Sequence, residues 1–312
     1  TLALLAYQTA YLKANYPWHF MASLLTIEAH NTDKLAMYMG ECRDMGVPIL
    51  PPDVNASVMA FKVSPQHGVR FGLIAVKNVG ANAIASILDV RRETGRITSI
   101  FSLCEEIDLR LVNKRVLESL VKAGAFDSSV PDQRFADSQK DVRERLTRSP
   151  QPTNGSRGVA KRRAQMVALV DRALEHGGHL QRDRDRGQTQ LFGSLEHGDG
   201  AGDDVVLPDV PAWSESEQLA NEKEALGLYL SGHPIDGYRD QLEAAGARTI
   251  TSLAASEPQV LVGGIISGYR PLKTKRGALM AVLTLEDRDG SLEVVVFPKT
   301  YERCAPVLVA DR

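Results

Sequence analysis

Cysteine is scarce in this sequence, which excludes folds that depend on paired cysteines. The 312 residues include three, Cys42, Cys104 and Cys304, and these lie far apart. An odd number of widely spaced cysteines supplies neither a disulfide framework nor the paired spacing of a zinc site. We therefore expect reduced thiols, most of them buried.

Long apolar runs are also missing. No stretch approaches the roughly 18 apolar residues that a membrane-spanning helix requires. The first residues lack the charged start, apolar core and cleavage pattern of a secretory signal. These absences predict a cytoplasmic location and no membrane partner. Because the first residue, Thr1, is not a methionine and the sequence stops at Arg312 just after an apolar run, we expect it to be part of a longer chain.

Net charge is nearly absent, but the charges are unevenly distributed. The formal charge is -2, yet residues 137–186 carry 12 Lys or Arg against 7 Asp or Glu, and residues 196–226 carry 1 against 9. The average alone suggests no affinity for nucleic acid. The local reversal predicts a basic segment followed by an acidic one.

The first 130 residues predict a mostly helical region with one small hairpin. Good helix formers fill residues 2–15. A second helix is expected to start at Thr32, as its cap, and to end near Gly46. Apolar residues at 61–63 and 69–73 predict two short paired strands.

A turn pattern that binds DNA in other proteins lies at Ile74–Gly80, before a predicted helix over residues 81–92. It resembles a helix-hairpin-helix, whose tight turn directs backbone amides at a helix N-terminus toward a DNA phosphate. Asn78 stands where that motif usually has glycine, and Asn is the residue that best replaces glycine in a left-handed conformation. The residues expected to contact DNA are Lys77, Asn78, Val79, Gly80 and Ala81.

A second hairpin of this kind is expected at Val116–Phe126. Its contacts would be Lys122, Ala123 and Gly124, with Lys122 at the glycine position. Tandem hairpins contact phosphates and not bases. The predicted DNA binding is therefore sequence-nonspecific and sensitive to salt. A helical hairpin without any ligand is the alternative interpretation.

Residues 131–187 predict a basic helical segment, interrupted at 150–158 and losing order over 177–187. In the polar stretch that follows, Leu191 and Phe192 stand behind Gln188 and between glycines. Two apolar side chains in a flexible polar segment are typical of a short peptide that anchors in a partner's pocket.

Histidines in and near this stretch do not predict a metal site. No cysteine or paired carboxylate completes a ligand set with His176, His179 and His197, so solvated side chains are the expected state. A later histidine, His233, follows a predicted helix over 214–230 and precedes Pro234. We expect it to serve as a cap and turn residue and to have no catalytic role.

The C-terminal part predicts a β-meander with strands at 260–269, 279–286 and 292–297, followed by a helical stretch over 301–309. The loop over 270–277 is basic and matches the first loop of an OB-fold, which binds single-stranded nucleic acid. Its expected DNA contacts are Lys273, Lys275 and Arg276. Because an OB-fold needs five strands, the barrel is expected to be truncated.

The order of these pieces resembles the C-terminal third of the alpha subunit of bacterial DNA polymerase III, among the C-family replicative polymerases. The resemblance rests on residues 7–13, 50–55, the hairpin around Gly80, and residues 122–127, 226–234 and 285–290. It implies an α+β fold: a mostly helical part with tandem helix-hairpin-helix, a flexible linker, and the truncated OB-fold.

The resemblance also implies a division of the chain and a partner for the exposed peptide. Gln188, Leu191 and Phe192 resemble the internal peptide that binds the beta sliding clamp. The implied regions are the end of the fingers domain (1–30), the helix-hairpin-helix domain (31–130), the basic helical segment (131–187), the clamp-binding peptide (188–193), an acidic linker and helix (194–245), and the partial OB-fold (246–312).

The family transfers nucleotides with two Mg²⁺ ions held by converging carboxylates. This sequence offers no such set, because Asp183 and Asp185 fall in the expected linker and Asp287 and Asp289 fall in a turn. We therefore expect no catalytic residue, metal or cofactor here, although Mg²⁺ is implied for the whole polymerase. The expected partners are duplex and single-stranded DNA, the clamp and other replicase subunits.

Two other classes of protein also fit part of the pattern. One is a non-catalytic repair or recombination scaffold that joins hairpins to an OB-fold, which would lack paired carboxylates upstream. The other is an RNA-binding OB module of the aminoacyl-tRNA synthetase type, for which residues 283–297 would also be suitable. Preferential binding of tRNA would favour the latter.

Overall fold

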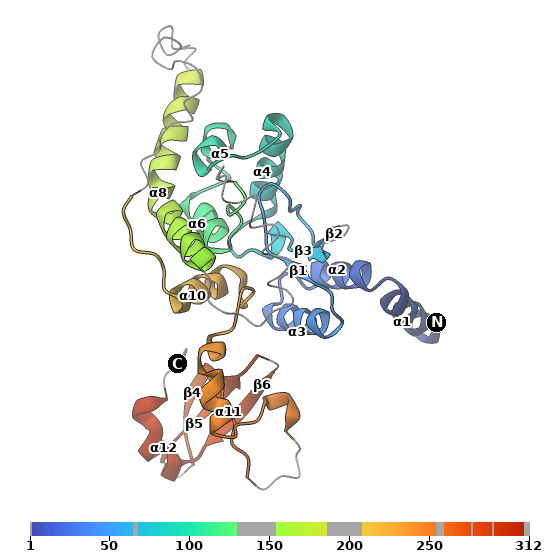
Figure 1. Ribbon diagram of the computed structural model, residues 1–312, viewed down its shortest axis with the longest axis vertical. Helices are drawn as coiled ribbons and strands as arrows, with labels where there is room; N and C mark the ends of the chain where they lie inside the picture. Colours follow the sequence, from blue (N-terminus) through green and yellow to red (C-terminus); the bar gives the residue numbers. More distant parts are fainter. Residues whose placement is uncertain are drawn as a thin grey trace. The chain divides into compact units, whose positions relative to one another are not determined.

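The computed structural model describes residues 2–64, 68–129, 154–185, 208–253, 259–275, 277–288 and 290–308. The chain divides into two compact units, Thr1–Leu230 and Ser231–Arg312 (Figure 1). No helix in these described ranges is long and apolar enough to cross a membrane.

The first unit is helical with one small sheet. Its helices are α1 (Leu2–Asn15), α2 (Pro17–Ile27), α3 (Thr32–Asp44), α4 (Ala81–Thr94), α5 (Ile100–Glu106), α6 (Lys114–Lys122), α8 (Asn154–Asp185) and α10 (Glu215–Leu226), and its strands are β1 (Ile49–Leu50), β2 (Lys62–Ser64) and β3 (Gly68–Arg70). Strand β3 pairs antiparallel with β2 and parallel with β1. The predicted hairpin is confirmed, whereas β1 is too short to show a period in the sequence.

Two helix starts in this unit differ from the prediction. The helix at residue 32 is capped by Asn31, whose side chain accepts a hydrogen bond from the Lys34 amide at 3.2 Å. Thr32 is therefore its first helical residue and not its cap. Helix α2 was not predicted: Pro17 ends α1 and at the same time opens α2, because the first turn of a helix tolerates a missing N–H.

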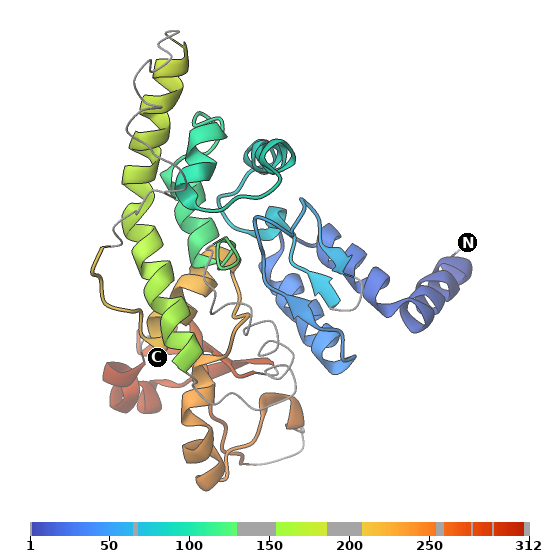
Figure 2. The same cartoon turned by 45° about the horizontal axis from the view of Figure 1, so that its top comes forward.

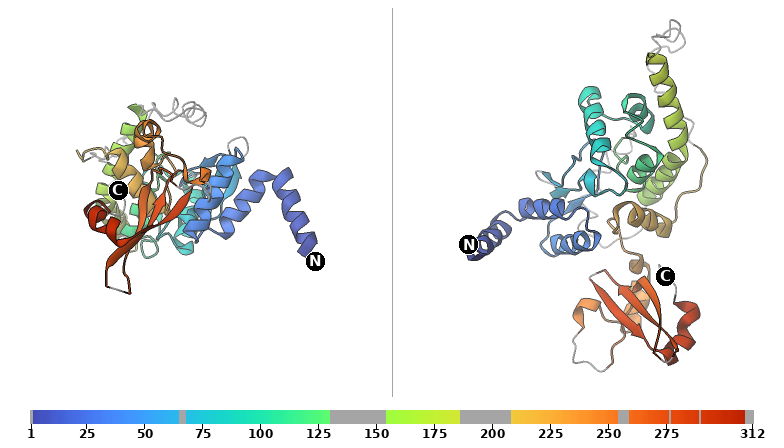
Figure 3. Two further views of the ribbon diagram at one scale, coloured as in Figure 1. Left: turned by 90° about the horizontal axis from the view of Figure 1, so that it is seen from below. Right: turned by 180° about the vertical axis from the view of Figure 1, so that it is seen from behind.

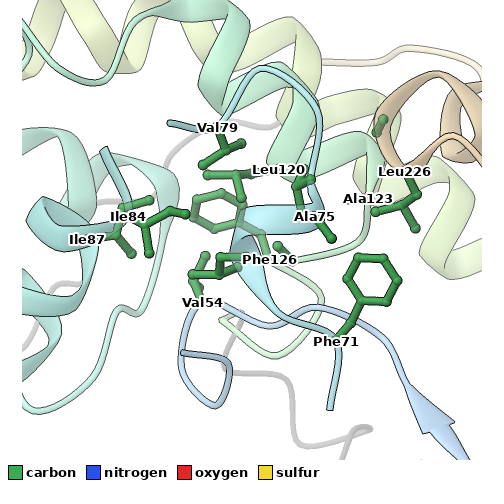
Figure 4. Close-up of a cluster of buried hydrophobic side chains, with 14 of the residues drawn as sticks. Val54, Phe71, Ala75, Val79, Ile84, Ile87, Leu120, Ala123, Phe126 and Leu226 are labelled. Atoms are coloured by element: carbon green, nitrogen blue, oxygen red, sulfur yellow. The ribbon is translucent and has the colours of Figure 1, made fainter. Parts of the chain in front are cut away.

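The core of the first unit joins the turn before α4 to α6 and the segment after it. Val79, Leu120 and Phe126 are all at most 5% exposed and belong to one buried cluster. Figure 4 shows Val79 and Leu120 beside the Phe126 ring, with Ile84 and Ile87 of α4 approaching the same cluster. The Val79 side chain thus anchors the turn before α4 in the core.

A single side chain joins two loops of this core. The Asn55 amide donates to the carbonyl oxygen of Ile97 at 2.9 Å and accepts from the Ile97 N–H at 2.8 Å. Nearby, Arg91 donates to the carbonyl oxygens of Val54 and Ser57 at 3.0 and 2.6 Å. The two Asn55 bonds join its loop to the α4–α5 connection in the way that paired backbone groups join two strands, and the Arg91 bonds tie the same loop to α4.

Helix α8 is longer than the sequence predicts. It begins at Asn154, inside the expected interruption, and continues through Gly177 and Gly178 to Asp185. The predicted loss of order over 177–187 is therefore wrong as far as residue 185. The cause is tertiary packing, since α8 lies along α5 and α6 (Figure 2). A β-carbon on Gly177 would lie 2.1 Å from the Cys104 carbonyl oxygen, so this glycine allows close approach of two backbones.

The two adjacent glycines of α8 should respond oppositely to alanine. Gly177→Ala should lower the free energy of unfolding by about 1–3 kcal/mol, because the methyl group overlaps the α5 backbone. Gly178→Ala, whose β-carbon would meet only a Leu109 methyl group at 3.7 Å, should raise it by about 0.5–1 kcal/mol through helix propensity. Urea unfolding of both variants provides the measurement. Equal effects would contradict the close-packing role.

Helix α10 ends earlier than predicted. It starts after Ser214, which forms a reciprocal capping box with Glu217. It ends at Leu226 instead of residue 230 because Gly227 adopts a left-handed conformation with φ 81°. His233 caps the short 3-10 helix Pro234–Tyr238 through Nδ1, which accepts from the Ile235 amide at 3.3 Å. The predicted capping role of His233 is confirmed.

The second unit is a three-stranded antiparallel sheet with short helices (Figure 3). Its elements are α11 (Arg239–Ala244), β4 (Ile265–Lys273), β5 (Leu279–Glu286), β6 (Ser291–Val296) and α12 (Pro298–Cys304), in strand order β4-β5-β6. The meander is confirmed, with β4 shifted toward the C-terminus and α12 starting three positions before Tyr301. Within the described residues this sheet does not close into a barrel.

Candidate nucleic-acid interface

The turn from Lys77 to Ala81 presents its backbone at the surface. Lys77, Asn78, Gly80 and Ala81 are exposed, while Val79 between them is buried in the core. Asn78 has φ 66°, so it takes the left-handed conformation of the glycine that it replaces. Its side-chain amide donates to the Ser119 hydroxyl of α6 at 3.0 Å. The turn is therefore rigid on its inner side and open on its outer side.

The N-terminus of α4 is free to accept an anion. Gly80 occupies the N-cap position and provides no side-chain acceptor for the first-turn amides. A β-carbon built on Gly80 would meet nothing within 4 Å, so the surface beside these amides is open. Uncapped amides and the helix dipole together favour a negatively charged group at this point.

Lys77 joins this turn to α10. Its backbone amide donates to the Ala225 carbonyl oxygen at 2.8 Å. Its side chain is exposed and runs past Gly227, where an added β-carbon would lie 3.1 Å from Nζ. The ammonium group therefore lies beside the C-terminal end of α10, while the backbone of Lys77 belongs to the open turn.

The second predicted hairpin needs correction. Lys122 ends α6, and no helix starts after it among described residues 123–129. Ala123 and Gly124 are buried, and Lys122 pairs with Glu224 of α10 at 2.8 Å. A β-carbon on Gly124 would lie 2.2 Å from Arg163, so protein covers this turn. The structure does not present these three residues to a phosphate.

A second turn, residues 107–113, lies earlier in the chain, between α5 and α6. Val112, Asn113 and Leu117 stand at one constant sequence spacing from Val79, Gly80 and Ile84. Val112 and Leu117 are fully buried like their counterparts, and Asn113 is the N-cap of α6, where its side chain accepts from the Val116 amide. This repeat in the spacing of buried residues was the sequence signal that could have located the second turn.

Exposed cations surround the turn between α5 and α6. Arg110 and Arg115 are exposed, and Lys114 pairs with Asp171 of α8 at 2.7 Å. The Asp108 carboxylate accepts from the Arg110 guanidinium and backbone, which lowers its pKa. The sequence prediction missed these residues because it placed the second turn after α6.

A buried ion pair closes the turn after α6. The Arg163 guanidinium of α8 is 5% exposed, and its Nε and Nη2 donate to the Asp127 carboxylate at 3.0 and 2.5 Å. Burial lowers the pKa of Arg163, but the charge and hydrogen bonds of Asp127, together with the charge of Glu222, outweigh burial and raise it overall. This pair fixes α8 against the core of the first unit.

The basic loop of the second unit is only partly described. Lys273 is the last residue of β4 and not a loop residue, and it is exposed together with Lys275. Arg276 lies outside the described residues. The turn Thr274–Ala278 is closed by a hydrogen bond from the Thr274 amide to the Ala278 carbonyl oxygen at 2.9 Å.

Gln188, Leu191 and Phe192, for which the sequence predicts clamp binding, lie outside the described residues, as do His197 and Asp289. Asp183 and Asp185 belong to α8 and not to a linker. His176 approaches Glu105 of α5 at 3.2 Å. No group of three His, Cys, Asp or Glu side chains that could hold a metal ion occurs in the described parts of the chain.

The cysteines are free thiols, as predicted. Cys42 and Cys104 are buried, and burial, together with neighbouring glutamates, raises the pKa of each thiol to about 12. Cys304 is partly exposed.

Comparison with known proteins gives a consistent picture. Residues 46–136 match the family described as helix-hairpin-helix motif, and this range includes the turn before α4 and the turn between α5 and α6. The chain is 39% identical to DNA polymerase III subunit alpha of Saccharopolyspora erythraea and 36% identical to that of Mycobacterium tuberculosis, with 99% of the chain and 24% of each relative aligned. It is also 39% identical to that of Thermus aquaticus, over 22% of the relative. The chain thus spans about a quarter of the length of these relatives.

Proposed function

We propose that this chain is the C-terminal, DNA-binding and clamp-tethering portion of a replicative DNA polymerase. The proposal is supported by the chain's homology, along its whole length, to part of DNA polymerase III subunit alpha. Nucleotidyl transfer would be carried out by carboxylates and Mg²⁺ ions held outside these residues. This chain would hold the polymerase on its template.

One observation carries the DNA-binding part of the proposal. The turn over residues 77–81 combines a left-handed Asn78, an exposed lysine and an uncapped helix N-terminus with open space in front of it. These features are suited to binding a phosphate oxygen, and they include no side chain placed to recognise the edges of the bases. Binding is therefore expected to be sequence-nonspecific.

The second turn extends the contact along the backbone. Arg110 and Arg115 flank it and are exposed. Two rigid turns on one core would contact the backbone of the duplex at two places. Each phosphate that they neutralise increases the salt dependence of the DNA affinity. We propose this turn as the second hairpin in place of Lys122–Gly124.

The remaining parts of the proposal concern two further contacts, one with the sliding clamp and one with single-stranded template. Gln188, Leu191 and Phe192 would bind the sliding clamp, since this pattern stands in a polar stretch of the sequence between α8 and α10. Lys273, Lys275 and Arg276 would contact single-stranded template from a partial OB-fold. The clamp encircles the same DNA, so several weak contacts would act as one strong tether.

Gly80→Val tests the first turn directly. The added side chain has room in the fold, because no atom lies within 4 Å of the new β-carbon, yet it would block a phosphate from the amides. We expect duplex affinity in low salt to fall about tenfold, as loss of one charge-assisted contact of about 1.4 kcal/mol predicts. Fluorescence anisotropy with a labelled duplex gives the measurement.

Gly40→Val is the matched control for this variant. Gly40 also has nothing within 4 Å of its added β-carbon, but it lies in α3, away from the proposed contacts. Its duplex affinity should be unchanged. An equal affinity for the Gly80 variant and the unmodified chain would remove the turn from the DNA interface.

A further inference from the structure

Each of the two turns donates a hydrogen bond to the helix that follows the other turn. In the turn before α4, the Asn78 side-chain amide donates to the Ser119 hydroxyl of α6 at 3.0 Å. In the turn between α5 and α6, the Asp108 backbone amide donates to the Ser86 hydroxyl of α4 at 3.3 Å. The two turns are therefore linked to each other in both directions.

The two serines that accept these bonds occupy equivalent positions in α4 and α6. Ser86 and Ser119 are separated by the same number of residues as Val79 and Val112, the buried valines of the two turns. The apolar residues around the serines repeat at the same spacing and are fully buried in both helices. They are Ile84 and Ile87 in α4, and Leu117 and Leu120 in α6. The same helical position thus receives the opposite turn twice.

The side chains in these bonds have a use beyond the backbone that carries them. Ser119 is 6% exposed and Ser86 is half-buried, and serine is a poorer helix former than alanine. Asn78 has a left-handed backbone, with φ 66°, which glycine adopts more easily. Glycine, however, has no amide to donate to Ser119. Asparagine at this position therefore supplies both the left-handed turn and the link to α6.

We propose that Ser86 and Ser119 are positioning residues that hold the two turns in one fixed relation, so that both turns contact phosphates of a duplex at the same time. This inference rests on the proposed DNA-binding function. The phosphates of a duplex lie at fixed separations, so turns that are already held in a matching relation lose little further freedom on binding. When one turn is bound, the other is presented to the same duplex at a high effective concentration. The serines act through the turns and do not contact DNA themselves.

The test measures duplex affinity across a range of salt concentrations for the chain that carries Ser86→Ala together with Ser119→Ala. We expect the affinity in low salt to fall about tenfold, because the two turns no longer bind as one site. The slope of log affinity against log salt should become shallower by about 0.9, the contribution of one phosphate. Fluorescence anisotropy with a labelled duplex gives both values. A mere loss of folded chain would lower the affinity and leave the slope unchanged.

Asn78→Gly provides a second variant that empties no buried position. It keeps the left-handed turn and breaks the same bond as Ser119→Ala, from the other side. Each of these two changes should lower duplex affinity by the same factor, about threefold, and their combination should lower it no further. Losses that multiply in the combined variant would overturn the positioning role, because Asn78 would then act on DNA independently of Ser119.

Ser23→Ala is the matched control, since the Ser23 hydroxyl donates to the His19 carbonyl oxygen of its own helix, α2, at 2.9 Å. Its duplex affinity and salt slope should equal those of the unmodified chain. Failure of the unmodified chain to bind a duplex would overturn the DNA-binding function and the positioning role with it. If the unmodified chain binds and the double serine variant keeps both its affinity and its salt slope, the positioning role alone is wrong.

Discussion

Changing Leu191 and Phe192 together to alanine should abolish measurable binding to the sliding clamp. Both side chains are proposed anchors in a pocket, and each anchor of this kind contributes about 2 kcal/mol or more. Their combined loss corresponds to an affinity at least on the order of 1000-fold weaker. Isothermal titration calorimetry with the free clamp would measure the loss.

DNA binding by the same variant should stay within twofold of the unmodified chain, because no proposed phosphate contact is touched. Thr189→Ala is the matched control, since residue 189 occupies a position of the Gln-x-x-Leu-Phe pattern that accepts any residue. Clamp affinity that survives the loss of both anchors would refute the assignment of the peptide.

Asp127→Ala should lower the free energy of unfolding by about 3–5 kcal/mol. The substitution leaves the buried Arg163 guanidinium without the carboxylate that receives its hydrogen bonds. Removing one partner of a buried ion pair costs this much because the remaining charge stays out of water. The Glu222 carboxylate, which also raises the pKa of Arg163, supplies the part of the compensation that remains. Urea unfolding followed by circular dichroism gives the value.

The exposed pair Lys161–Asp209 provides the comparison. Its atoms are 3.5 Å apart and the Asp209 side chain is 99% exposed, so Asp209→Ala should change stability by less than about 0.5 kcal/mol. A loss from Asp127→Ala as small as this would mean that Arg163 finds another partner or reaches water. The pair would then not hold α8 against the core.

Local patterns in the sequence are sufficient to predict those helices and strands whose own residues show a clear period and a clear end. The helix over 2–15, the α4 helix after Gly80 and the meander of β4, β5 and β6 are confirmed. In each, a run of apolar residues with one period is bounded by a turn or cap residue. The left-handed Asn78 also follows from a local rule, since few other residues tolerate that conformation.

The misplaced elements depend on contacts between segments far apart in the sequence. The sequence predicts loss of order from Gly177 onward, but the lack of a side chain at this glycine serves the approach of α8 to α5. Lys122 was interpreted as a phosphate ligand, but Glu224, distant in sequence, pairs with it. Neither partner can be identified from the residues around the glycine or the lysine.

The candidate site was predicted in part for the same reason. The first turn is specified by a short motif, and the structure presents the predicted residues except Val79 at the surface. The second turn has no glycine, so only the repeated spacing of buried residues relates it to the first. A motif search that looks for glycine passes over it.

The paired hydrogen bonds of Asn55 have a consequence for the chemical lifetime of the protein. The side-chain amide supplies both a donor and an acceptor to Ile97, a combination that a carboxylate cannot reproduce. Deamidation to aspartate would set a negative oxygen against the Ile97 carbonyl oxygen and open the link between the two loops. The backbone amide of Ala56, the nucleophile in deamidation, is itself engaged by the Asp53 carbonyl oxygen at 3.2 Å. The bond from Ala56 to Asp53 withholds the nucleophile, and the two bonds to Ile97 hold the side-chain amide in place, so together they slow the deamidation of Asn55.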